Sequence, residues 1–129
     1  MTTELHILAW ALVLALIQVL LPSVLRSHET GLRYNASARD KPATPPGKLT
    51  GRLMRAQANL FETLPVFAIA ILITHMAGRE GPLTLTGAWL YLIARVVYVP
   101  LYAAGIPFLR SLAWIISLFG IILILVPII

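Results

Sequence analysis

Two stretches of this sequence place polar side chains among residues that are almost entirely apolar. In the first, Arg55, Asn59 and Glu62 are spaced i, i+4 and i+7, so a helix would carry them on one face. In the second, Arg95 stands among apolar and aromatic residues. Ionisable groups at membrane depth are costly and are usually retained for function. These residues are therefore the first candidates for a binding or catalytic site.

The second stretch also carries an aromatic stripe, because Tyr91, Arg95, Tyr98 and Tyr102 are spaced i, i+4, i+7 and i+11. Counting about 1.5 Å per residue from the same membrane surface places Glu62 and Arg95 both about 15 Å deep. Opposite charges at equal depth predict an ion pair, within one chain or across an interface. Such a pair would either hold a ligand or only fix the helix register.

The same depths predict a polar funnel that is basic at its mouth and ends at the carboxylate of Glu62. Asn59 should lie level with Tyr98. Arg55 should lie level with Tyr102. The last apolar stretch begins at the same end of the molecule and adds Arg110, Ser111 and Trp114 to the predicted funnel.

Simpler interpretations remain for some of these residues. Arg52 could anchor its helix among lipid headgroups, and Arg55 could extend its side chain to them. Tyr102 and Trp114 could belong to an aromatic belt at the membrane surface. The three histidines have no i+4 partner and the chain has no cysteine, so the sequence predicts no metal site.

The composition indicates the class of protein that positions these residues. Of 129 residues, 59% are hydrophobic and only 12% are charged, and the mean hydropathy is +0.87. A soluble domain of this size needs more charge to cover its surface, so the chain is predicted to be an integral membrane protein. The net charge of +5 lies in no basic stretch interleaved with aromatic residues, so no nucleic-acid partner is expected.

Four apolar runs, 5–25, 53–77, 84–104 and 107–129, are each long enough to cross about 30 Å of hydrocarbon. The first run is expected to be retained, because its flank is acidic and its apolar length exceeds that of a signal peptide. The polar segment 26–51 contains prolines and glycines that interrupt a helix. The other links are short. The predicted fold is therefore an all-α, up-down antiparallel four-helix membrane bundle in a single domain.

Basic residues near the helix ends predict the orientation in the membrane. Segment 26–51 and the start of the next run are strongly basic, and Arg110 follows the link 104–107. The opposite side has only Arg79 together with acidic residues. The basic links 26–51 and 104–107 should face the cytoplasm, with both termini outside.

Three segments resemble the MAPEG family, the membrane-associated proteins in eicosanoid and glutathione metabolism. Arg55-Ala-Gln-Ala-Asn59-Leu-Phe-Glu62-Thr-Leu-Pro65-Val-Phe67 resembles the family's helix-two signature. Arg95-Val-Val-Tyr98-Val-Pro100-Leu-Tyr102, followed by Arg110-Ser111, resembles the motifs of helices three and four. Tyr34-Asn-Ala-Ser-Ala-Arg39-Asp40 is similar to the bacterial branch, which implies a bacterial inner membrane.

The resemblance implies a homotrimer whose sites lie between protomers, open to the cytoplasm and take glutathione as a co-substrate. Arg110 and Ser111 match the residues placed near the thiol, where they would favour the nucleophilic thiolate. The positions that match residues holding or lining the tripeptide are Arg55, Asn59, Glu62, Arg95, Tyr98 and Tyr102.

Three functions fit these observations. The first is a glutathione-dependent transferase or peroxidase that acts on lipophilic electrophiles dissolved in the bilayer. The second is a non-catalytic membrane protein of the same fold that binds a lipid or another ligand. The third is a small proton-coupled exporter, against which the predicted arginine partner of Glu62 argues, because a proton carrier must be free to titrate.

Overall fold

The computed structural model describes all 129 residues and contains four long helices. They are α1 (Thr3–Thr30), α3 (Lys48–Met76), α4 (Pro82–Ala103) and α5 (Pro107–Leu125). All four are long and apolar enough to cross a membrane, which confirms the predicted all-α integral membrane fold. Two short elements complete the chain, the helix α2 (Leu32–Ala36) and a final 3-10 turn, η1 (Val126–Ile128).

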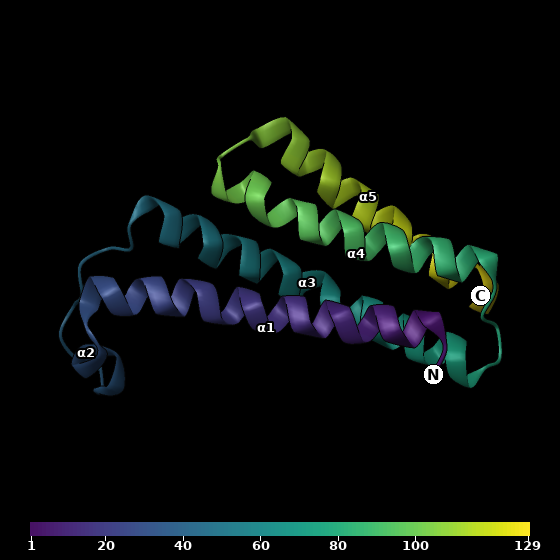
Figure 1. Cartoon of the computed structure of the whole chain (residues 1–129), viewed down its shortest axis with the longest axis horizontal. Coiled ribbons are helices and arrows are strands. Elements are labelled where there is room, and N and C mark those ends of the chain that lie inside the picture. Colours follow the sequence, from purple (N-terminus) through teal and green to yellow (C-terminus); the bar gives the residue numbers. More distant parts are fainter.

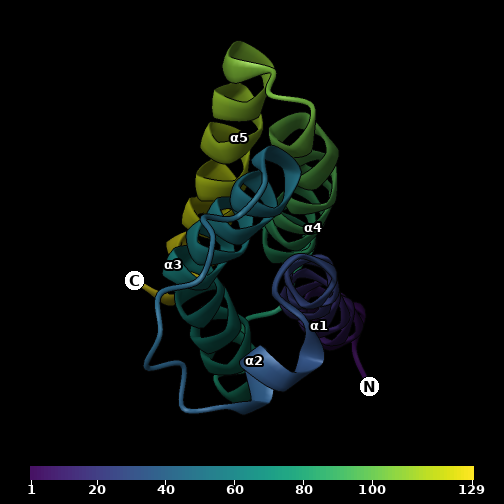
Figure 2. The ribbon, with the colours of Figure 1, turned by 90° about the vertical axis from the view of Figure 1, so that its left-hand side faces the viewer.

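The four helices run alternately up and down, with α1 beside α3 and α4 beside α5 (Figure 1). Both chain termini lie at one end of the bundle (Figure 1). The α1–α3 connection with α2 and the α4–α5 link lie at the other end, which faces the viewer in Figure 2. We call this second end the basic end, because it holds most of the arginines: Arg26, Arg33, Arg39, Arg52, Arg55 and Arg110.

Both helices next to the polar segment are longer than the apolar runs. Helix α1 continues to Thr30 and ends at Gly31, whose φ of 86° is favourable for glycine. Helix α3 begins at Lys48, and α2 lies inside a segment that the sequence predicts to be a loop. The reason is that leaving the hydrocarbon does not itself end a helix, whereas glycine and proline do.

The carboxylate of Glu29 connects the two helices that flank this segment. It accepts hydrogen bonds from the Gly47 backbone N–H at 3.1 Å and from the Thr50 hydroxyl at 2.6 Å. The first N–H groups of a helix lack intrahelical partners and favour a negative charge. The last turn of α1 therefore caps the start of α3, which fixes the position of the functional face of α3.

The core lies where α1, α3, α4 and α5 converge. The rings of Phe67 and Tyr91 stack with centroids 4.0 Å apart and an interplanar angle of 12°. The Tyr91 hydroxyl hydrogen-bonds with that of Thr63 at 2.9 Å. Tyr91, the first residue of the predicted aromatic stripe, is thus a core residue with a satisfied hydroxyl.

The opposite end is held together by short polar contacts between α1 and the α3–α4 link. The Thr2 hydroxyl donates to Glu80 at 2.6 Å, and His75 contacts the same carboxylate at 3.0 Å. Partial burial raises the pKa of Glu80, but these hydrogen bonds and the neighbouring histidine lower it more, so its pKa lies below the ordinary value. Thr84 also donates to the buried Glu4 at 3.1 Å.

Helices α4 and α5 cross closely at two facing glycines. A Cβ atom added to Gly87 would lie 2.4 Å from the carbonyl oxygen of Gly120, and one added to Gly120 would lie 2.6 Å from that of Gly87. Small residues at such crossings allow two membrane helices to approach backbone to backbone. The crossing sets how far α5 stands from α4 and so where Arg110 lies.

We expect Gly87→Ala to destabilise the protein by about 1–3 kcal/mol, because the added methyl group forces the two backbones apart. The thermal midpoint in detergent measures the effect. Gly81→Ala is the matched control, since nothing lies within 4 Å of the added Cβ there and its extended backbone accepts any residue. Equal midpoints for the two variants would contradict a close crossing.

Candidate functional site

Side chains from α3, α4 and α5 meet at the basic end around Tyr102. The Nε of Arg55 donates to the Tyr102 hydroxyl at 3.2 Å, and the Arg110 guanidinium lies over the Tyr102 ring, 4.6 Å from its centroid. A chamber of about 210 Å³ opens here. Its lining residues are Arg52, Arg55, Tyr102, Gly105, Pro107 and Arg110.

A second chamber of about 160 Å³ is lined by residues of the same three helices. Arg110 lines both chambers, so its guanidinium lies at their boundary. Tyr98 lines the second chamber and packs edge-to-face on Tyr102, with ring centroids 5.6 Å apart. The two chambers therefore form one candidate site. The second is lined by Asn59, Tyr98, Arg110, Ser111 and Trp114.

Two predictions of equal depth along the helices are confirmed. Arg55 bonds to Tyr102, and Asn59 lines the same chamber as Tyr98. The predicted ion pair between Glu62 and Arg95 is wrong within the chain. Arg95 instead donates from Nη1 to the side-chain oxygen of Asn59 at 2.8 Å. Arg95 is 1% exposed in the chain.

The error has a geometric cause. Successive helix residues are about 100° apart around the axis, so Glu62 lies about 60° farther than Asn59 from the buried face of α3. Equal depth brings Glu62 and Arg95 to one level, but the angle around the helix decides which side chain reaches Arg95. The buried face is marked by Ala56, Leu60, Thr63 and Phe67.

Arg95 contacts Asn59 and Tyr98, which line the second chamber, but it lines neither chamber itself. Its guanidinium lies over the Tyr98 ring, 4.3 Å from the centroid, which is a favourable cation–π distance. Its Nε and Nη2 atoms are buried without a hydrogen-bond partner. The Trp114 Nε1, at the edge of the second chamber, is also buried and unpartnered. Such buried donors favour an acceptor beside them.

Glu62 does not close the funnel, contrary to the prediction. Its exposed side chain lines a separate groove of about 290 Å³ between α3 and α5. The rest of the groove is mostly apolar, and Glu62 forms no ion pair in the chain. The carboxylate therefore lies beside the arginine chambers and not at their closed end. The other lining residues are Thr63, Val66, Leu118, Ile121 and Ile122.

Arg52 belongs to the site although the sequence suggested only a membrane anchor. Its Nη1 donates to the Ala103 carbonyl at the end of α4 at 3.1 Å. The guanidinium also occupies the space beside Gly105, where an added Cβ would lie 2.7 Å from its Nη2, and the Gly105 φ of 74° forms the turn into α5. The signal in the sequence was its position one turn before Arg55. Arg52 thus ties α3 to the α4–α5 link and adds positive charge to the first chamber.

The chambers combine guanidinium groups with hydroxyl and amide groups, and neither is lined by a carboxylate. This arrangement suits an anionic ligand, because carboxylates bind well to guanidinium forks. No cluster of three potential metal ligands is present in the chain. Arg110 beside Ser111 is the pair that can stabilise negative charge on a reacting atom.

The model of the MAPEG family matches residues 7–129, nearly the whole chain. No curated protein and no solved structure matches it.

Proposed function

The chain belongs to the MAPEG family, a family of glutathione-related membrane enzymes, and from this premise we propose that it is a membrane-bound glutathione-dependent transferase or peroxidase. Its second substrate would be a lipophilic electrophile that enters from the bilayer. The observation that carries the proposal is the position of Arg110, which lines both chambers and lies next to Ser111.

The charges of glutathione fit this site. At neutral pH the tripeptide has two carboxylates and one ammonium group. In the proposed complex, Arg55 and Arg52 bind a carboxylate in the first chamber, while Asn59 and the tyrosines line the second. Arg110 and Ser111 lie beside the sulfur, where a guanidinium and a hydroxyl lower the thiol pKa and supply the nucleophilic thiolate.

Glu62 is assigned to the glutathione ammonium, since no other carboxylate lies near the chambers. Its exposure on a helix that spans the membrane supports assembly, because an unpaired carboxylate facing lipid is costly. We propose that a homotrimer covers this face and completes each site between protomers. The basic end faces the cytoplasm, in a bacterial inner membrane.

Glutathione binding and turnover test the proposal directly. Calorimetry on the purified protein in detergent should show saturable glutathione binding, and the complex should show the ultraviolet absorbance of a thiolate. Turnover is measured with a generic aryl halide and with a lipid hydroperoxide. Binding without turnover on either substrate would favour the non-catalytic alternative, and absence of binding would contradict the proposal.

One observation favours a second candidate, the proton-coupled exporter. The sequence argument against it required an arginine partner for Glu62, and the chain shows none. Two results together would identify this function. The protein in proteoliposomes would show proton-driven efflux that is lost in Glu62→Gln, and it would not bind glutathione.

A further inference from the structure

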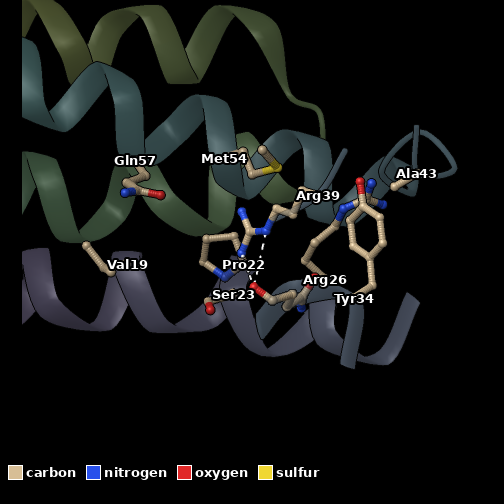
Figure 3. Close-up of a pocket in the computed structure, with 10 residues that line it drawn as sticks. Val19, Pro22, Ser23, Arg26, Tyr34, Arg39, Ala43, Met54 and Gln57 are labelled. Atoms are coloured by element: carbon tan, nitrogen blue, oxygen red, sulfur yellow. Dashed lines mark hydrogen bonds between the residues drawn. The ribbon is translucent and has the colours of Figure 1, made fainter. Parts of the chain in front are cut away.

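A cavity of about 350 Å³ is separate from the candidate site. It lies at the basic end between α1, α3 and the segment that carries α2 (Figure 3). None of its lining residues lines either arginine chamber or the groove beside Glu62. They are Val19, Pro22, Ser23, Arg26, Tyr34, Asn35, Arg39, Ala43, Met54 and Gln57.

Arg39 is held over this cavity by a strained backbone. It is the one non-glycine residue with a positive φ, 58°, a conformation that is unfavourable for L-residues. Its Nε and Nη2 donate to the Asn35 carbonyl at 3.2 and 2.9 Å. Figure 3 shows the side chain directed toward Pro22 and Met54. Strain kept at one residue points to a role for its side chain.

The segment around Arg39 is fixed by its own hydrogen bonds. The Tyr34 hydroxyl donates to the Lys41 carbonyl at 2.7 Å, and the Arg39 backbone N–H donates to the Ser37 hydroxyl at 3.1 Å. Arg26, on the α1 side of the cavity, donates to the Thr44 carbonyl. Hydrogen bonds within the fold therefore hold this wall of the cavity in place.

The cavity carries positive charge without a matching anion. Arg26 is paired with Glu29 at 3.0 Å, but Arg39 has no carboxylate partner. The side chains of Ser23 and Gln57 also line the cavity, and both can donate hydrogen bonds. One uncompensated guanidinium with neutral donors beside it matches a singly charged phosphate diester.

The cavity wall combines apolar and cationic groups. Val19, Pro22 and Met54 form its apolar part on α1 and α3. The Arg39 guanidinium lies beside Pro22 and Met54, and Arg26 lies farther toward the basic end, where α1 finishes (Figure 3). Apolar side chains next to a guanidinium match an amphiphile with an anionic head, whereas a soluble anion would leave the apolar part of the wall uncovered.

We propose that this cavity binds the headgroup of an anionic phospholipid, with the phosphate diester on Arg39 and the glycerol and upper acyl carbons against Val19, Pro22 and Met54. Anionic lipids are attracted to basic membrane-proximal segments, and the cavity gives this attraction a defined position. The site is independent of the glutathione proposal, since it shares no residue with the arginine chambers.

The test uses the thermal midpoint of the full chain in neutral detergent with added dihexanoyl phosphatidylglycerol. We expect a saturable rise in the midpoint with this lipid, and none with dihexanoyl phosphatidylcholine or inorganic phosphate. In Arg39→Gly the apparent affinity should fall at least about tenfold. Its lipid-free midpoint should change little, because glycine accepts the positive φ without strain, which offsets the loss of the hydrogen bonds to the Asn35 carbonyl.

Arg33→Ala is the matched control, because it removes one exposed arginine of the same segment that does not line the cavity. It should keep the response to phosphatidylglycerol. Four results would overturn the proposal. Three are equal responses to the two lipids, an unchanged response in Arg39→Gly, and equal losses in Arg39→Gly and Arg33→Ala. The fourth is a rise with inorganic phosphate alone, which would identify a free-anion site.

Discussion

Replacing Arg110 by alanine is expected to remove the thiolate absorbance of the glutathione complex and to lower turnover by about 10- to 150-fold. This range corresponds to the loss of one charge-assisted contact, about 1.5–3 kcal/mol. The effect should be large because Arg110 lines both chambers and is the guanidinium adjacent to Ser111. Ultraviolet difference spectra and initial rates with a generic aryl halide measure the two quantities.

Two further variants separate charge from geometry in this experiment. Arg110→Lys keeps the positive charge but loses the planar fork and its stacking on Tyr102, so partial recovery is expected. Arg79→Ala removes an exposed arginine at the opposite end and should leave both signals unchanged. Unaltered absorbance and rates in Arg110→Ala would exclude Arg110 from thiol activation and leave Ser111 or a tyrosine in that role.

The second large effect is expected at the buried pair of Asn59 and Arg95. Asn59→Leu removes the acceptor of the one hydrogen bond that Arg95 makes and leaves the buried guanidinium without a hydrogen-bond partner. The expected destabilisation is about 1.5–3 kcal/mol. Arg95→Met removes the charge and fills the space with an apolar side chain, so it should cost much less. The thermal midpoint in detergent measures both.

The double variant Asn59→Leu/Arg95→Met should recover much of the stability lost in Asn59→Leu, which is the sign of coupled residues. Glu62→Gln combined with Arg95→Met should be additive within about 0.5 kcal/mol, because these side chains do not pair. The opposite pattern would be non-additive effects of the Glu62 and Arg95 substitutions together with additive effects of the Asn59 and Arg95 substitutions. It would indicate that Arg95 pairs with Glu62 and not with Asn59. The rescued double variant should fold but bind glutathione more weakly.

The sequence by itself was sufficient for the helices and for most of the candidate site. Apolar length and the scarcity of charge depend on composition alone, so four spanning helices could be predicted without a structure. The i, i+4, i+7 spacing correctly placed Arg55 level with Tyr102 and Asn59 beside Tyr98. These are local properties, because helix rise and periodicity do not depend on the rest of the fold.

The tertiary structure decided the partners and the cavities. Arg95 bonds to Asn59 and Glu62 turns to the apolar groove because the rotation of α3 about its axis is set by packing. The close approach of Gly87 and Gly120 and the position of Arg39 over the cavity beside α1 likewise join residues far apart in the chain. Periodicity fixes the relative angles of residues on one helix, but only contacts with neighbouring helices fix which angle faces inward.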